Sequence, residues 1–109
     1  MDDRVLGAIL EYQGVRGIVV RNGIICSVSY SPERILIPEG IIGLHDSCFS
    51  GQDNLLYVRL PRSVVLVGDN VFSNCINLEV IRIHDEQKEL ECKLRLGNNG
   101  LIEYIHDLF

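Results

Sequence analysis

The sequence predicts an α/β repeat protein, a short solenoid of β-strands with one-turn helices that is capped by a different segment at each end. Two observations predict this fold. The segments Ile37–Leu60 and Leu60–Ile83 align at a spacing of 23 residues, and neither end of the chain follows that spacing. A unit of this length cannot bury its own apolar face, so neighbouring units must stack and share one core.

Residues 1–16 are expected to form the N-terminal cap of a single domain, 1–109. Asp2 or Asp3 can cap a short helix, and Gly14 can end it. A strand is the alternative interpretation of the same segment. The sequence therefore leaves open whether this cap is helical or extended.

A degenerate repeat with a hairpin is expected at residues 17–37. Two β-rich runs flank Asn22-Gly23, and this dipeptide favours the positive φ angles of a type I′ turn. The two regular repeats follow, at residues 38–60 and 61–83. Each predicts a strand that ends at a proline, a turn, a second extended piece and a tight helical turn, since proline cannot donate a ladder hydrogen bond.

Aspartates lie at matching positions in the two regular repeats. Asp46 and Asp69 each precede the segment that we expect to form a one-turn helix. A carboxylate at that place can accept hydrogen bonds from free backbone amides. The aspartates are therefore predicted to cap these one-turn helices.

Residues 84–109 are expected to form the C-terminal cap as a strand followed by a helix. Their first part is polar and acidic, which predicts a solvated loop. Apolar and charged residues then alternate over residues 90–96, which predicts a half-buried strand. After a GNNG turn, residues 101–109 place their apolar side chains on one helical stripe, with Asn98 or Asn99 as the cap.

Both repeats carry the same set of structural residues, represented in the second repeat by Pro61, Asp69, Phe72 and Leu78. This pattern resembles the BspA-like class of leucine-rich repeats, whose module runs roughly IPxSVxxIGxxAFxxCxNLxxIxI. The resemblance covers residues 17–84. It implies a leucine-rich-repeat fold and a binding or adhesion role, without specifying an activity or a partner.

The charge of the chain bears on its partners and location. A net charge of -5 and a pI near 5.0 argue against binding to nucleic acid or to an anionic membrane, both of which require clustered Lys and Arg. The acidic start does not resemble a signal peptide, and no apolar run is long enough to span a membrane. A cytoplasmic location is expected, and a surface location is the alternative.

Cysteine and histidine are the candidate catalytic or metal-binding residues. Cys26, Cys48, Cys75 and Cys92 contain no CxxC pair, and they occupy positions that predict buried structural thiols. His45 and His84 are interpreted as surface substitutions, and His106 lies beside Asp107 without a recognisable nucleophile. We therefore expect no catalytic site, no cofactor site and no metal site.

Outward residues of the strands are the first candidate binding surface. Because strand residues alternate between core and exterior, stacked repeats should align their outward side chains in columns. One column would contain Arg34, Tyr57 and Val80, and the other Leu36, Arg59 and Arg82. Tyrosine and arginine are enriched at interface hot spots, so these six residues are predicted to bind a partner.

A second candidate surface lies on the other extended piece of each repeat. Ile42, Val65 and Leu66 occupy positions where the resemblance implies serine or threonine. We expect these three residues to bind a protein partner or a second copy of the chain, giving a homo-oligomer. The alternative is that the terminal segments fold back and cover them.

The sequence therefore predicts a non-catalytic protein–protein interaction module, such as a small regulator or inhibitor that binds a protein partner. One alternative is a fragment of a surface adhesion protein. A Cys/His-dependent enzyme is the second. Two regular repeats between two unlike ends favour a closed, capped unit over a slice of a longer array.

Overall fold

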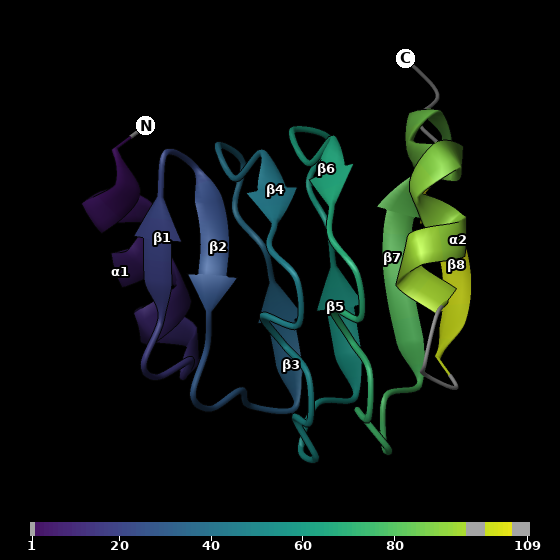
Figure 1. Ribbon diagram of the computed structural model, residues 1–109, viewed down its shortest axis with the longest axis horizontal. Coiled ribbons are helices and arrows are strands. Elements are labelled where there is room, and N and C mark those ends of the chain that lie inside the picture. Colours follow the sequence, from purple (N-terminus) through teal and green to yellow (C-terminus); the bar gives the residue numbers. More distant parts are fainter. Residues whose placement is uncertain (1, 96–99, 106–109) are drawn as a thin grey trace.

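The computed structural model describes residues 2–95 and 100–105. Its strands form two four-stranded sheets with the orders β1-β2-β4-β6 and β3-β5-β7-β8 (Figure 1). The elements in chain order are α1 (Asp3–Gln13), β1 (Val19–Arg21), β2 (Ile24–Ser27), β3 (Arg34–Leu36), β4 (Gly43–Leu44), β5 (Tyr57–Arg59), β6 (Leu66–Val67), β7 (Val80–His84), the 3-10 helix η1 (Asp85–Leu90), α2 (Glu91–Arg95) and β8 (Leu101–Ile105).

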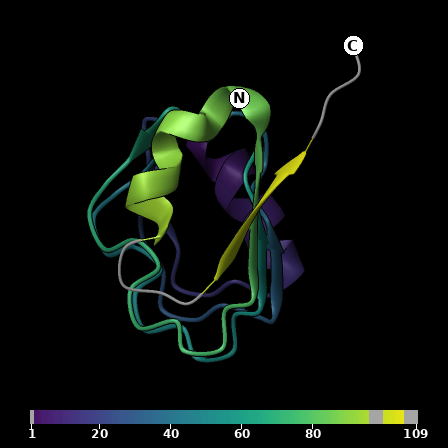
Figure 2. The same cartoon turned by 90° about the vertical axis from the view of Figure 1, so that its right-hand side faces the viewer.

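Successive repeats pair in parallel at the predicted spacing. In one sheet Ile35 is paired with Val58, and Val58 with Ile81; in the other, Leu44 is paired with Val67. Viewed along the row of repeats, the successive repeats follow nearly the same outline (Figure 2). A repeat fold that combines helices with strands in sheets is therefore confirmed.

The core contains equivalent residues from successive repeats. The inward strand residues Ile35, Val58 and Ile81 are fully buried. Phe49 and Phe72 stack with ring centroids 5.5 Å apart and ring planes inclined by 20°. Each repeat thus buries its neighbour's apolar side chains, which explains why neither could fold alone.

The N-terminal cap is a helix followed by a hairpin. Asp2 caps α1 by accepting a hydrogen bond from the Arg4 amide at 2.7 Å, and Gly14 ends it with a φ of 111°. Asn22 and Gly23 both have positive φ, as the predicted turn between β1 and β2 requires. The predicted N-terminal helix and the predicted hairpin are both confirmed.

The predicted one-turn helices are wrong: residues 46–51 and 69–74 form turns. Ser47, Asn70 and Asn74 have φ between 58° and 61°. Left-handed residues of this kind interrupt a right-handed helix. Each segment contains single i to i−3 hydrogen bonds, such as that from the Ser50 amide to the Ser47 carbonyl at 3.0 Å, but no consecutive series that would form a helix.

Side chains in these turns reach the neighbouring repeat. Asp46 Oδ1 accepts a hydrogen bond from the Asp69 amide at 2.7 Å, and the Asp69 carboxylate in turn accepts one from Lys93 on α2. The prediction that the aspartates cap their own turns is therefore wrong. The buried Cys75 thiol likewise donates to the Phe49 carbonyl of the preceding repeat, at 3.1 Å.

The C-terminal cap reverses the predicted order of strand and helix. Residues 85–90 form a 3-10 helix where a solvated loop was expected, and residues 91–95 form a helix where a strand was expected. Residues 101–105 extend the sheet as β8, paired with β7 in parallel, where a helix was expected. The predicted caps Asn98 and Asn99 lie outside the described residues, as does the end of that predicted helix.

The C-terminal helix and strand were predicted in the wrong order because each needs only one inward apolar residue, which several local structures can provide. Alternating apolar residues in 90–96 fit a strand, but a short helix needs only Leu94 to point inward, and this side chain is 1% exposed. In β8, Ile102 is the inward residue and lies beside Ile81 of β7. Sheet pairing at the open edge of β7 therefore overrides the local helical pattern.

Gln87 closes the C-terminal end of the repeats. Within the repeats, Ser63 Oγ donates to the Ile41 carbonyl of the preceding repeat at 2.7 Å. Gln87 makes the equivalent link with its amide, since Nε2 donates to the Pro61 carbonyl at 2.7 Å and to the Val64 carbonyl at 2.9 Å. The Gln87 side chain thus pairs backbone groups that no further repeat covers.

We predict that Gln87→Leu lowers the free energy of unfolding by about 2–4 kcal/mol, because the variant keeps the volume but leaves buried backbone groups unpaired. These groups include the His84 amide, which donates to Gln87 Oε1 at 2.8 Å. Urea denaturation measures the loss. Lys88→Leu, at the exposed neighbouring position, is the matched control. Equal stability of the two variants would contradict this role of Gln87.

Candidate protein-binding surface

The six predicted outward strand residues lie on one face of the β3-β5-β7-β8 sheet, which we call the strand face. Register places Arg34, Tyr57 and Val80 in one column. Leu36, Arg59 and Arg82 form the second. Because the intervening residues are buried, the side chains of the strand face are turned away from the core.

Tyr57 lies at the centre of the strand face, in contact with Arg34 and near Arg82. The Arg34 guanidinium carbon lies 4.5 Å from the centroid of the Tyr57 ring, in cation–π contact. The Tyr57 hydroxyl, with a smaller contribution from Glu103, raises the pKa of Arg82, which indicates that this guanidinium lies near the same tyrosine. The Arg82 Nε lies 3.4 Å from Glu103 Oε1. Tyr57 therefore lies in a cationic setting on the strand face.

The strand face combines positive charge with apolar area. Arg34, Arg59 and Arg82 concentrate three cations there on a chain whose net charge is -5. Leu36 is 49% exposed at the edge strand. Arginine forks bind carboxylates through paired hydrogen bonds, and neighbouring apolar side chains can be desolvated on contact. This arrangement suits an acidic protein surface.

Sequence reasoning missed the fourth strand of this face. Leu101 and Glu103 on β8 extend the two columns, because β8 pairs with β7 through Val80 and Arg82. The sequence does carry a signal for this strand, because β5, β7 and β8 share a three-residue pattern of an apolar or aromatic residue, an aliphatic residue and a charged residue. The pattern reads YVR in β5, VIR in β7 and LIE in β8. The shorter step of 21 residues from β7 to β8 concealed it.

Ile42, Val65 and Leu66 form a separate surface, which we call the aliphatic patch. It borders the other sheet, where Leu66 in β6 pairs with Gly43 in β4. Their exposed fractions are 41%, 64% and 56%. The structure thus divides the nine predicted binding residues into two groups on different sheets. Residues 84–95 and 100–105 leave the patch exposed, so they do not cover it as the alternative proposed.

Two cysteines are buried in the core, as predicted. Burial raises the pKa of Cys48 to about 12 and also raises the pKa of Cys75. Both therefore carry a proton at neutral pH, which disfavours a nucleophilic role. Cys26 is half-buried in β2. Cys92 is exposed on α2, so its predicted burial in a strand is wrong.

The two described histidines differ in exposure. His45 is exposed, as predicted. His84 is only 7% exposed, so its interpretation as a surface substitution is wrong. It ends β7 at the place that Pro61, also buried, takes in the preceding repeat. His106 and Asp107 lie outside the described residues.

Residues 2–95 and 100–105 contain neither a candidate metal site nor a candidate membrane span. In these residues no group of three or more His, Cys, Asp or Glu side chains is placed to hold a metal ion. Within the same part of the chain, no helix has the length and apolar character needed to cross a membrane. The candidate site is therefore built from the strand face and the aliphatic patch.

Parallel strands at a fixed spacing, with an ordered outward face, define a repeat protein of the leucine-rich class. The chain matches the family described as BspA type leucine rich repeat region (6 copies) over residues 26–94. It belongs to this family, which confirms the resemblance inferred from its motifs. No curated protein and no solved structure matches the chain.

We predict that the four thiols differ sharply in reactivity. Cys92 is exposed and should be alkylated first by iodoacetamide at pH 8, while burial protects Cys48 and Cys75. Mass spectrometry of the native protein, followed over time, identifies the modified positions. Denatured protein, in which all four should react, is the control. Rapid modification of Cys48 in the native protein would contradict its burial.

Proposed function

We propose that this chain is a non-catalytic protein–protein interaction module built on a short leucine-rich-repeat solenoid, acting as a small regulator or inhibitor of a protein partner. The observation that carries the proposal is the strand face, where the Arg34 guanidinium lies over the Tyr57 ring. Rigid aromatic anchors with neighbouring arginines are typical of binding hot spots. Family membership supports a binding role and agrees with a general lack of catalysis.

The charges of the strand face indicate what the partner presents. Arg34 and Arg59 lie on adjacent strands and are both exposed. A partner with Asp or Glu side chains around a small apolar centre would complement both the cations and Leu36. We therefore propose an acidic protein surface as the target. Its attraction should weaken as salt is added.

The aliphatic patch is proposed as a second contact with protein. Val65 and Leu66 are more than half exposed and adjoin Ile42 of the preceding repeat. Exposed aliphatic groups that adjoin each other often mark an interaction site. Because this patch borders the other sheet, a partner that used both surfaces would have to wrap around the molecule.

We predict that Tyr57→Ala combined with Arg59→Ala weakens partner binding by more than about 1 kcal/mol, because the central anchor and one cation are lost. The partner is first captured from the native host and identified by mass spectrometry. Calorimetry with the purified partner then measures affinity, and thermal unfolding checks that the variant stays folded.

The matched control for this experiment is Tyr30→Ala combined with Arg21→Ala, which removes the same residue types from exposed positions away from the strand face. It should bind like the parent protein. Val65→Asp combined with Leu66→Asp tests the aliphatic patch in the same assay. Full affinity of the Tyr57 and Arg59 variant would exclude the strand face as the binding surface.

A further inference from the structure

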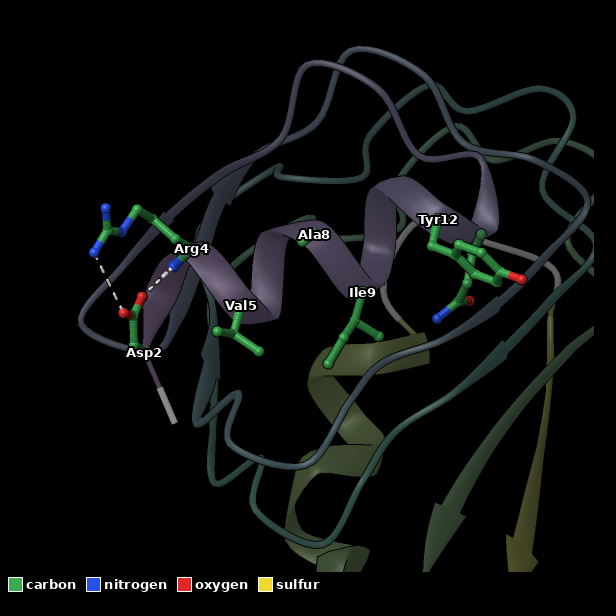
Figure 3. Close-up of a pocket in the computed structure, with 7 residues that line it drawn as sticks. Asp2, Arg4, Val5, Ala8, Ile9 and Tyr12 are labelled. Carbon is green, nitrogen blue, oxygen red and sulfur yellow. Dashed lines mark hydrogen bonds and ion pairs between the residues drawn. The ribbon is translucent and has the colours of Figure 1, made fainter.

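The N-terminal helix α1 has two apolar faces. Leu6 and Leu10 are fully buried against the repeats. Val5, Ala8, Ile9 and Tyr12 line a shallow hollow of about 680 Å³ on another side of the helix (Figure 3). Tyr12 is 94% exposed and Val5 46% exposed. A surface helix normally needs only one apolar face, so the second calls for its own explanation.

Hydrogen bonds at both ends hold α1 in a fixed orientation. The Asp3 carboxylate accepts from the amides of Asn22 and Gly23, each at 2.8 Å. At the other end, the Gln13 side chain both donates to the Leu36 carbonyl and accepts from the Leu36 amide, each at 2.8 Å. The helix therefore cannot roll to bury the second face, which remains available to another molecule.

The spacing of the exposed residues fits an antiparallel helix pair. Val5, Ala8, Ile9 and Tyr12 follow the i, i+3, i+4, i+7 pattern, which places them in one stripe. If a two-fold axis passes between positions 8 and 9, Tyr12 faces Val5 of a second copy. Ile9 then faces Ala8. Each large side chain meets a smaller one, as two self-complementary surfaces require.

The charges beside this stripe are self-complementary in the same arrangement. Arg4 and Glu11 are seven residues apart, about two helical turns, so they lie on the same flank. Both are exposed. The two-fold axis brings Arg4 within about 3 Å, measured along the helix axis, of Glu11 in the second copy. Two reciprocal ion pairs result, whereas a parallel two-fold pair would place the charged flanks of the two copies on opposite sides of the interface, where Arg4 and Glu11 could not meet.

We propose that α1 is a self-association surface through which two copies of this chain pack antiparallel, with reciprocal Arg4–Glu11 ion pairs flanking the stripe. This goes beyond the proposed function, which concerns the strand face. A single helix stripe buries less than about 1,200 Å², so the dimer is weak and reversible. It forms at high micromolar concentrations.

Sedimentation equilibrium between about 10 µM and about 1 mM tests the proposal, and the parent protein should show a mass that rises from one chain toward two. Arg4→Glu and Glu11→Arg each place like charges together and should weaken the dimer at least about fivefold. The double charge reversal restores opposite charges, so its dissociation constant should return to within about twofold of the parent value.

Two control variants locate the surface. Lys88→Glu changes an exposed charge on η1, and Val65→Asp with Leu66→Asp alters the aliphatic patch. Neither should change the mass, whereas Ala8→Glu at the centre of the stripe should leave single chains. Circular dichroism confirms that each variant is folded.

Three results would overturn the proposal. The first is a mass of one chain at every concentration. The second is a dimer that the patch variant disrupts and Ala8→Glu does not. The third is a double charge reversal that stays as weak as the single variants, which would show that Arg4 and Glu11 do not meet between copies.

Discussion

Hydrogen bonds between equivalent turns, one repeat apart, are the constraint on which this structure depends. The Asp46 carboxylate binds the amide of Asp69 itself, its own counterpart one repeat later. A Cβ atom at Gly68 would lie 2.3 Å from Asp46 Oδ1, so only glycine permits this approach. A slip of one residue would break these bonds and turn the inward side chains outward. The fixed period therefore follows from chemistry at the turns as well as from the apolar core.

The same constraint separates structure from function along the chain. Inward positions such as Val58 and Ile81 must remain aliphatic, whereas outward positions such as Tyr57 and Val80 can differ between repeats. The ends need separate solutions, because no further repeat pairs their backbone groups. At each end a glutamine side chain pairs such backbone groups. Gln13 binds the Leu36 backbone at the edge of β3, and Gln87 binds carbonyls of the last regular repeat.

The repeats could be predicted from the sequence because identical residues recur in register, as Phe49 and Phe72 do. The outward columns followed from strand alternation alone, which is why the strand face was placed correctly. The C-terminal cap could not be predicted in the same way. Cys92 alternates with apolar neighbours, a pattern compatible with a strand or with a short helix, and only packing against the last repeat decides between them. Burial of His84 likewise depends on tertiary contacts.

Bonds and side chains shared between repeats should make the chain one cooperative unit. Native-state hydrogen exchange of the Ile37 and Leu60 amides tests it most directly, because each donates to a carbonyl one repeat later, Arg59 and Arg82 respectively, at 2.9 Å. Both amides should exchange with the same free energy, equal to that of global unfolding by urea. Exchange of either amide at a clearly lower free energy would show that the repeats open separately and would contradict this cooperativity.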